Sequence, residues 1–195
     1  MQCFPVPLLL ASTSPRRAEL MNMLHYPYTV AAPTDDESSH IASPAALVEQ
    51  LALRKAQSVA RAQGGPAWVI GADTIVCIDG QVLGKPASAA QARQMLQALQ
   101  GRSHEVYTGI ALVEARGGRQ LSGCERTLVH VGALSSAQIE EYVQSGEPLD
   151  KAGAYGIQGR FACYISGIEG DFYNVMGLPL YALRKLLASA AHAWR

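Results

Sequence analysis

The stretch from Trp68 to Ile78 reads WVIGADTIVCI, and its one charged residue is Asp73. Continuous apolar runs of this kind are typical of central strands in sheets that are covered on both faces. An unpaired carboxylate inside such a strand would cost several kcal/mol, so Asp73 requires a cation, a metal or strong hydrogen-bond donors. A structural ion pair would meet that need, and so would a functional site. Gly71 and Ala72 leave room beside Asp73, which favours the site.

Strands and helices are expected to alternate along the rest of the chain. Further strands are predicted over residues 8–11, 26–32, 81–83, 106–114, 119–131 and 161–168, and helices over 16–24, 44–63, 88–99, 135–146 and 179–191. The connections include both hairpins, as at Asp79-Gly80, and crossovers. The pattern predicts an α/β fold with a mixed, twisted sheet and flanking helices.

Length and composition limit the classes to which this chain can belong. Its 195 residues, 49% of them apolar, suit one domain over 1–195, or two closely fused lobes, and exclude disorder. Sixteen basic and sixteen acidic residues cancel, and 7% of residues are aromatic, so nucleic-acid binding is not expected. The apolar run over 6–11 is too short for a membrane span, and no signal peptide is evident.

The four cysteines, Cys3, Cys77, Cys124 and Cys163, lie far apart and form no C-x-x-C pair. A disulfide framework or a cysteine metal cluster is therefore not expected, and a reducing cytoplasm is the predicted compartment. Each thiol is better interpreted as a small core hydrophobe than as a reactive group.

The helix start Ser14-Pro15-Arg16-Arg17 departs from the usual pattern. Serine at the N-cap and proline at the first helical position are ordinary. Two arginines in the first turn oppose the helix dipole, which favours acidic residues there. Both could simply be solvated at a small cost. The favoured interpretation is a phosphate site, in which backbone N–H groups and two guanidinium groups converge and the hydroxyls of Ser12 and Ser14 assist.

Three of the four lysines of the chain stand at unusual positions, although the chain otherwise uses arginine. Lys55 lies in the middle of the apolar stripe of the helix over 44–63. There it would either extend to water or reach into a polar cleft, and the spacing favours neither. Lys85 follows the expected hairpin strand, next to the strand that contains Asp73. Lys151 is the third.

Lys151 lies near the start of a loop over 149–159 in which three glycines, Gly153, Gly156 and Gly159, follow one another at three-residue spacing. Such glycines permit tight turns and close approach of the backbone to a ligand. The spacing matches neither the dinucleotide fingerprint nor a P-loop. The loop over 149–159 is therefore either an ordinary turn-rich connection or part of a binding site.

Four ordered blocks of sequence together resemble the Maf family of nucleotide pyrophosphatases. The blocks are ASTSPRR at 11–17, GADT at 71–74, GKP at 84–86 and DKAGAYGIQG at 150–159, with Asp36-Glu37 and Gly177-Leu178-Pro179 in addition. The resemblance implies an inosine-triphosphatase-like (Maf/Ham1) fold with two lobes around a cleft, and a homodimer. It also implies hydrolysis of nucleoside triphosphates, with a divalent cation, to the monophosphate and pyrophosphate. The pattern is similar to that of the dTTP/UTP subgroup.

The resemblance also implies roles for individual residues. Asp73 matches the catalytic proton acceptor, and Arg16, Thr74 and Gln158 match positions associated with substrate choice. The candidate catalytic residues are thus Asp73, Lys55 and Lys85; the candidate substrate-binding residues are Ser12, Ser14, Arg16, Arg17, Thr74, Lys151 and Gln158; and the candidate ligands for Mg²⁺, Mn²⁺ or Co²⁺ are Asp36 and Glu37.

Two other functions compete with this one. A non-catalytic nucleotide-binding regulator, linked to septum formation and cell division, would use the same cationic residues. It would have little use for an acid such as Asp73 beside its bound anion. An enzyme that removes modified nucleotides from the pool would tolerate many bases and would prefer 5-modified pyrimidine nucleotides to UTP.

Overall fold

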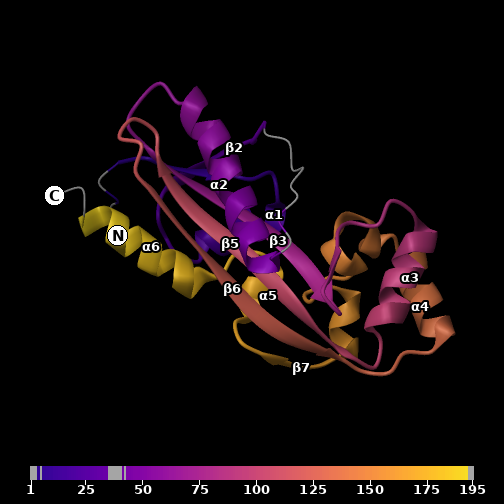
Figure 1. Cartoon of the computed structure of the whole chain (residues 1–195). Coiled ribbons are helices and arrows are strands. Elements are labelled where there is room, and N and C mark those ends of the chain that lie inside the picture. Colours follow the sequence, from indigo (N-terminus) through magenta and orange to yellow (C-terminus); the bar gives the residue numbers. More distant parts are fainter. Residues whose placement is uncertain (1–3, 5, 35–40, 42, 193–195) are drawn as a thin grey trace. The chain divides into compact units, whose positions relative to one another are not determined.

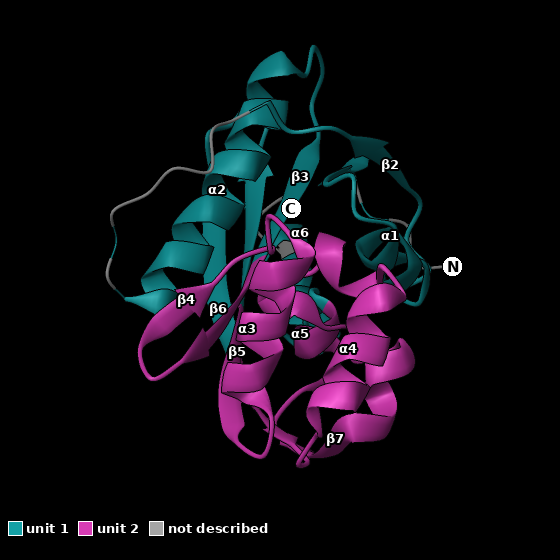
Figure 2. Cartoon of the chain, turned by 90° about the vertical axis from the view of Figure 1, so that its right-hand side faces the viewer, with its two compact units in different colours: residues 1–73, 108–125, 177–195 teal, residues 74–107, 126–176 magenta. Residues whose placement is uncertain are grey.

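The computed structural model describes residues 4, 6–34, 41 and 43–192. The chain forms two compact units, each assembled from separate stretches of sequence (Figure 2). Unit 1 comprises residues 1–73, 108–125 and 177–195, and unit 2 comprises 74–107 and 126–176. The expected single domain over 1–195 and the expected cleft between lobes stay predictions.

A seven-stranded sheet has the order β2-β1-β3-β5-β6-β7, with β4 paired to β3 (Figure 1). β1 is parallel to β2 and β3, whereas β4 is antiparallel to β3 and β7 is antiparallel to β6. The mixed sheet predicted from the sequence is confirmed. Its strands are β1 (Leu8–Ala11), β2 (Tyr28–Ala31), β3 (Trp68–Ile78), β4 (Gln81–Leu83), β5 (Ser103–Glu114), β6 (Gln120–Val131) and β7 (Ile165–Glu169).

Unit 1 contains the helices α1 (Pro15–Asn22), α2 (Pro44–Ala62) and α6 (Leu180–His192). α2 has Pro44 at its first position and buries its apolar stripe. The cluster that it forms with the sheet consists of Leu9, Ala11, Ala52, Ala56, Val59, Ala60, Ala67, Val69, Ala111 and Val113. Most of these side chains are small, so the helix can lie close to the strands.

Unit 2 contains α3 (Ala89–Leu99), α4 (Ser136–Gln144), α5 (Phe172–Met176) and the 3₁₀ helices η1 (Glu147–Asp150), η2 (Ala152–Ala154) and η3 (Arg160–Tyr164). α4 begins at a capping box formed by Ser135 and Gln138. Phe161 is fully buried, and its ring centroid lies 5.0 Å from those of Tyr142 and Tyr155. This aromatic cluster packs α4 against the glycine-rich segment.

Three features differ from the sequence-based expectation. The strand predicted over 161–168 begins only at Ile165, because η3 occupies its first half. Phe161 is buried there within a 3₁₀ turn rather than by strand pairing, and periodicity alone does not separate the two. The loop expected over 149–159 includes η2 and the end of η1. The short helix α5 was not predicted, because five residues are too few to show a helical periodicity in the sequence.

Two observations concern the environment of the protein. None of the helices in the described ranges is both long and apolar enough to cross a membrane. The three cysteines that the structure describes, Cys77, Cys124 and Cys163, are free thiols.

Candidate active site

Lys55 and Asp73 meet in unit 1. The Nζ of Lys55 lies 2.5 Å from Oδ1 of Asp73, and the two side chains are only 12% and 11% exposed. Separating such a pair would leave a charge unpaired in a poorly solvated place, so each group holds the other in position. Of the partners that the sequence allowed for Asp73, which were a cation, a metal or strong donors, the structure supplies a cation. It also decides between the alternatives for Lys55, whose ammonium group turns to a carboxylate instead of extending to water.

Two glycines of the sheet let α2 come close enough for this contact. A Cβ on Gly71 would lie 2.1 Å from the carbonyl oxygen of Ala52, and a Cβ on Gly109 would lie equally close to the backbone of α2. Ala52 is one turn before Lys55, and Gly71 shares a strand face with Asp73. The interpretation that Gly71 leaves room beside Asp73 is therefore wrong, because the backbone of α2 fills that space.

The start of α1 brings several of the predicted phosphate-binding residues together. Ser14 is the N-cap and Pro15 opens the helix, as expected, but the Ser14 hydroxyl caps no backbone group among the described residues. Ser12, which is 5% exposed, accepts hydrogen bonds instead. Its Oγ accepts hydrogen bonds from the backbone N–H of Ser14 at 3.2 Å and from Nη1 of Arg17 at 3.4 Å. Ser12 therefore shapes the turn that leads into the helix.

Arg17 also reaches a distant part of unit 1. Its Nε donates to the carbonyl oxygen of Gly177 at 2.9 Å. Gly177 has a φ of 110°, a conformation that favours glycine, and it begins the motif Gly177-Leu178-Pro179 ahead of α6. Arg17 thus has a packing role besides the phosphate role predicted for it.

The three residues matched to substrate choice lie on different elements. Arg16 is in the first turn of α1. Thr74 follows Asp73 in β3, so its side chain points to the opposite face of that strand. Gln158 is exposed, between η2 and η3. Their role in base recognition stays a prediction.

Lys85 is exposed and lies just after β4 in unit 2. The carbonyl oxygen of Gly84, the preceding residue, accepts the N–H of Gly153 at 3.1 Å. Gly153 has a φ of 68°, and a Cβ there would lie 2.8 Å from the side chain of Val76. The first glycine of the loop is therefore required by packing, and the turn of Lys85 is tied to the loop.

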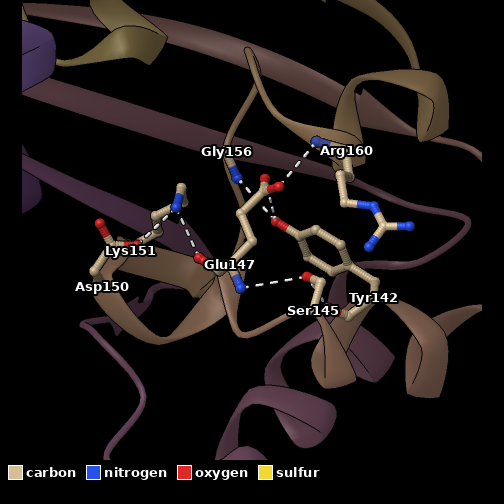
Figure 3. A network of polar contacts seen from close by, with 7 residues as sticks. All are labelled: Tyr142, Ser145, Glu147, Asp150, Lys151, Gly156 and Arg160. Carbon is tan, nitrogen blue, oxygen red and sulfur yellow. Dashed lines mark hydrogen bonds and ion pairs between the residues drawn. The ribbon is translucent and has the colours of Figure 1, made fainter.

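Lys151 is turned toward its own loop (Figure 3). Its Nζ donates to the carbonyl oxygen of Glu147 at 2.7 Å and to Oδ1 of Asp150 at 2.6 Å, and the side chain is 14% exposed. A Cβ on Gly156 would lie 2.7 Å from Cε of Lys151. In this arrangement Lys151 holds the loop, and contact with a substrate would require it to leave these partners.

A buried hydrogen bond fixes the middle of the same loop. His104 Nε2 and Tyr155 Oη lie 2.7 Å apart, and both residues are buried. Burial lowers the pKa of His104 to about 4 and raises the pKa of Tyr155. The imidazole is therefore neutral and the phenol protonated near pH 7. Tyr155 is a packing residue that joins the loop to β5.

A serine, a histidine and a glutamate are hydrogen-bonded across β5, β6 and β7. Ser103 Oγ lies 2.6 Å from Nδ1 of His130, and Nε2 of His130 lies 2.9 Å from Oε1 of Glu169. Serine hydrolases place the hydroxyl at Nε2 and the acid at Nδ1, so the ring nitrogens are used in the reverse order here. The Glu169 side chain is 72% exposed. We interpret the group as a cross-strand polar ladder.

The candidate metal ligands Asp36 and Glu37 lie outside the described residues. Within the described ranges, no three His, Cys, Asp or Glu side chains are grouped so as to hold a metal ion. Asp73, the acid of the described site, has Oδ1 bound to Lys55. Two successive carboxylates suit Mg²⁺ chemically, since hard cations take oxygen ligands. Their role stays a prediction.

Sequence reasoning missed the residues that hold the glycine-rich loop. Tyr142 accepts the backbone N–H of Gly156 in the loop, and Glu147 accepts that of Arg160 directly after it. His104 contacts the loop through Tyr155. These partners come from different elements, so no local motif connects them. The glycine spacing was the available signal, since a glycine indicates that another group comes close.

Comparisons with known proteins show the family and, separately, the fold. A family model described as Maf-like protein matches residues 7–190. A Symbiobacterium thermophilum protein named dTTP/UTP pyrophosphatase is 56% identical over 181 residues, with 92% of each chain covered. A Moorella thermoacetica protein of the same name is 54% identical over 183 residues, with 93% of each chain covered. A HAM1 protein structure from Coxiella burnetii has 18% identity and a TM-score of 0.54, covering 94% of this chain and 99% of that one. The expected Ham1-like α/β fold is confirmed.

Proposed function

Since the chain belongs to the Maf family, we propose that it is a nucleoside triphosphate pyrophosphatase that hydrolyses dTTP and UTP to the monophosphate and pyrophosphate. The observation that carries the proposal is the poorly solvated pair of Lys55 and Asp73. Hydrolysis needs a group that takes a proton from water. A protein that only binds phosphate has little use for a carboxylate beside its anion.

The proposed reaction is an attack of water on the α-phosphorus. The bond from that phosphorus to the oxygen that bridges to the β-phosphorus breaks, and pyrophosphate leaves with the electron pair. The proton of the water passes to Asp73, at Oδ2, because Lys55 binds Oδ1. The charge that develops on the phosphoryl oxygens needs fixed positive groups nearby. Lys55 and Lys85 are the residues proposed for this role.

The first turn of α1 is the proposed phosphate site of unit 1. Backbone N–H groups and the helix dipole favour an anion there, and Arg16 and Arg17 add two guanidinium groups. Ser12 binds both Arg17 and the N–H of Ser14, so part of this site is ordered before a substrate arrives. Ordered donors lose less conformational freedom on binding, which favours affinity.

The cation and the base are the remaining partners. We propose that Asp36 and Glu37 hold Mg²⁺, Mn²⁺ or Co²⁺, which when bound would neutralise charge on the triphosphate. Gln158 is proposed to contact uracil or thymine, because its carboxamide can both donate and accept hydrogen bonds. Thr74 and Lys151 complete the proposed substrate contacts.

The test measures pyrophosphate and orthophosphate release from a panel of nucleoside triphosphates, with Mg²⁺ and with EDTA. Metal-dependent pyrophosphate release from dTTP and UTP is expected, and the variant Asp73→Asn should lose it. Binding without turnover of any nucleotide would instead indicate a regulator, with Asp73 a structural acid. Higher activity on 5-modified pyrimidine nucleotides than on UTP would indicate removal of modified nucleotides.

We also propose that the protein is a homodimer and that it resides in a reducing compartment. The free thiols of Cys77, Cys124 and Cys163 support the compartment, because disulfides are rare there. Burial raises the pKa of Cys124 to about 11, so that thiol is a poor nucleophile at neutral pH. Light scattering of the purified chain tests the dimer, and the mass of a single chain would contradict it.

A further inference from the structure

The side chain of Glu147 lies close to the backbone of Gly156 and of Arg160 (Figure 3). Its Oε2 accepts the N–H of Arg160 at 3.0 Å, and its Oε1 accepts the hydroxyl of Tyr142 at 3.0 Å. Tyr142 Oη in turn accepts the N–H of Gly156 at 3.3 Å. The backbone amides two residues before and two residues after Gln158 are therefore held by one linked pair of side chains.

This pair is itself well anchored. Tyr142 is 3% exposed and packs on Phe161, and burial and the neighbouring Glu147 raise the pKa of its phenol. The phenol therefore stays protonated and donates to the carboxylate throughout the neutral range. The N–H of Glu147 donates to Ser145 Oγ at 3.3 Å. Hydrogen bonds to a carboxylate are stronger than those between neutral groups, so Glu147 is a firm anchor for the backbone N–H of Arg160.

The glycines of the loop make room for these side chains. A Cβ on Gly159 would lie 1.9 Å from Oε1 of Glu147. A Cβ on Gly156 would instead meet the stem of Lys151, which donates to the carbonyl oxygen of Glu147. The spacing of the second and third glycines is thus explained by Glu147 and Lys151, without a ligand.

We infer that Tyr142 and Glu147 are positioning residues that fix Gln158 and thereby set the selectivity for the base. The inference rests on the proposed function, in which the exposed Gln158 side chain contacts the pyrimidine. A carboxamide distinguishes two bases only if its donor and acceptor are held in place, because a mobile group adapts to either. The two amide anchors restrict the backbone that carries this carboxamide.

The experiment compares kcat/KM for dTTP with kcat/KM for CTP in the full chain. Glu147→Gln and Tyr142→Phe should each lower the dTTP/CTP ratio about tenfold, the effect of losing one hydrogen bond to a charged group. Glu141→Gln is the matched control. It removes a carboxylate 3.8 Å from the Arg160 side chain and leaves both amide anchors intact, so its ratio should equal that of the wild type.

A double-mutant cycle separates positioning from a loss of general stability. In a Gln158→Ala background, where the ratio is already low, Glu147→Gln should lower it no further. Unchanged ratios in Glu147→Gln and Tyr142→Phe, or additive effects in the cycle, would overturn the inference. An unchanged ratio in Gln158→Ala would overturn it as well.

Two further measurements test the inference if Glu147→Gln does not fold or if the wild type has no hydrolytic activity. If Glu147→Gln fails to fold by circular dichroism, Tyr142→Phe and Gly159→Ala carry the same test, because a Cβ on Gly159 must displace the carboxylate. If the wild type hydrolyses no nucleotide, the proposed function has failed. The ratio of the dissociation constants for dTTP and CTP, from calorimetry on the same variants, then tests the positioning role by the same criteria.

Discussion

The Lys55–Asp73 pair and the glycine-rich loop show two ways of holding a polar side chain in place. In unit 1, main-chain packing holds the side chain of Lys55 in place. Gly71 lets the backbone of α2 lie close to β3, and Lys55 of α2 then reaches Asp73. In unit 2, the segment around Gln158 lies between two short 3₁₀ helices, and side chains from other elements bind its amides.

Glycine marks both regions, for different reasons. In β3 it admits another main chain, and in the loop it admits a carboxylate and a lysine stem. Main-chain packing involves the whole hydrophobic cluster of unit 1, so a change there should reduce global stability. Side-chain anchors are few and local, so a change in the loop should mainly reduce order near the substrate.

The largest expected effect comes from replacing Asp73, the acid of the Lys55–Asp73 pair. Asp73→Asn keeps the size of the side chain and an acceptor for Lys55 but removes the base, so kcat for dTTP should fall about 10²–10⁴-fold. Steady-state pyrophosphate release measures this. Asp79→Asn is the control, because that exposed acid immediately follows the same strand. Full turnover in a folded Asp73→Asn would remove Asp73 from the role of base.

The next effect tests the anchoring of the loop through pH. Burial lowers the pKa of His104 from 6.5 to about 4, so between these values the unfolded chain binds a proton that the folded protein does not. The contribution of the neutral His104 ring to the free energy of unfolding is therefore fully present above about pH 6.5. It is lost as the pH falls toward 4, and the total loss is about 3 kcal/mol.

Urea unfolding of His104→Gln at pH 7.5, 5.5 and 4.5 measures this contribution, because the variant should lack it and show a shallower pH dependence. His25→Asn changes an exposed histidine with a φ of 54°, which asparagine tolerates, and should keep the slope of the wild type. If the free energy of unfolding depended on pH equally in the wild type and in His104→Gln, the lowered pKa of His104 would be contradicted.

A smaller effect is expected from the glycine of β3. The Cβ of Gly71→Ala must push α2 away from the sheet, which should reduce the free energy of unfolding by about 1–3 kcal/mol. Gly123→Ala, in β6, meets nothing within 4 Å and should change stability by no more than about 0.5 kcal/mol. Denaturant curves for the two variants compare them directly. Equal stability would show that α2 can shift without cost.

The smallest effect concerns the turn before α1. Ser12→Ala removes the acceptor for the N–H of Ser14 and for Arg17, and it should cost about 1 kcal/mol of unfolding free energy. It should also raise KM for dTTP more than it lowers kcat, because the ordered phosphate donors are lost. Thr13→Ala, at the exposed neighbouring position, is the control. A lower kcat at constant KM would place Ser12 in the chemical step instead.

Local pattern predicted most of the secondary structure. The apolar run of β3, the N-cap and proline of α1 and the start of α2 at Pro44 all appear where expected, because each depends on neighbouring residues. The stretch from Phe161 to Tyr164 was predicted as strand and forms a 3₁₀ helix instead. The burial of Phe161 depends on aromatic rings from α4 and the loop, which no window of sequence contains.

The sequence by itself determined that this is an α/β chain, that Asp73 needs a cation, a metal or strong donors and that a cationic turn opens the first helix. Hydrophobic periodicity, helix capping and the cost of a buried charge are enough for these conclusions, whereas the resemblance to the Maf family came from four ordered blocks of sequence. Only the tertiary structure decided which cation Asp73 meets, what fills the space beside Gly71 and which side chains hold the loop of Gln158. These are contacts between residues far apart in the chain, and such contacts follow from how helices and strands pack, which no local spacing specifies.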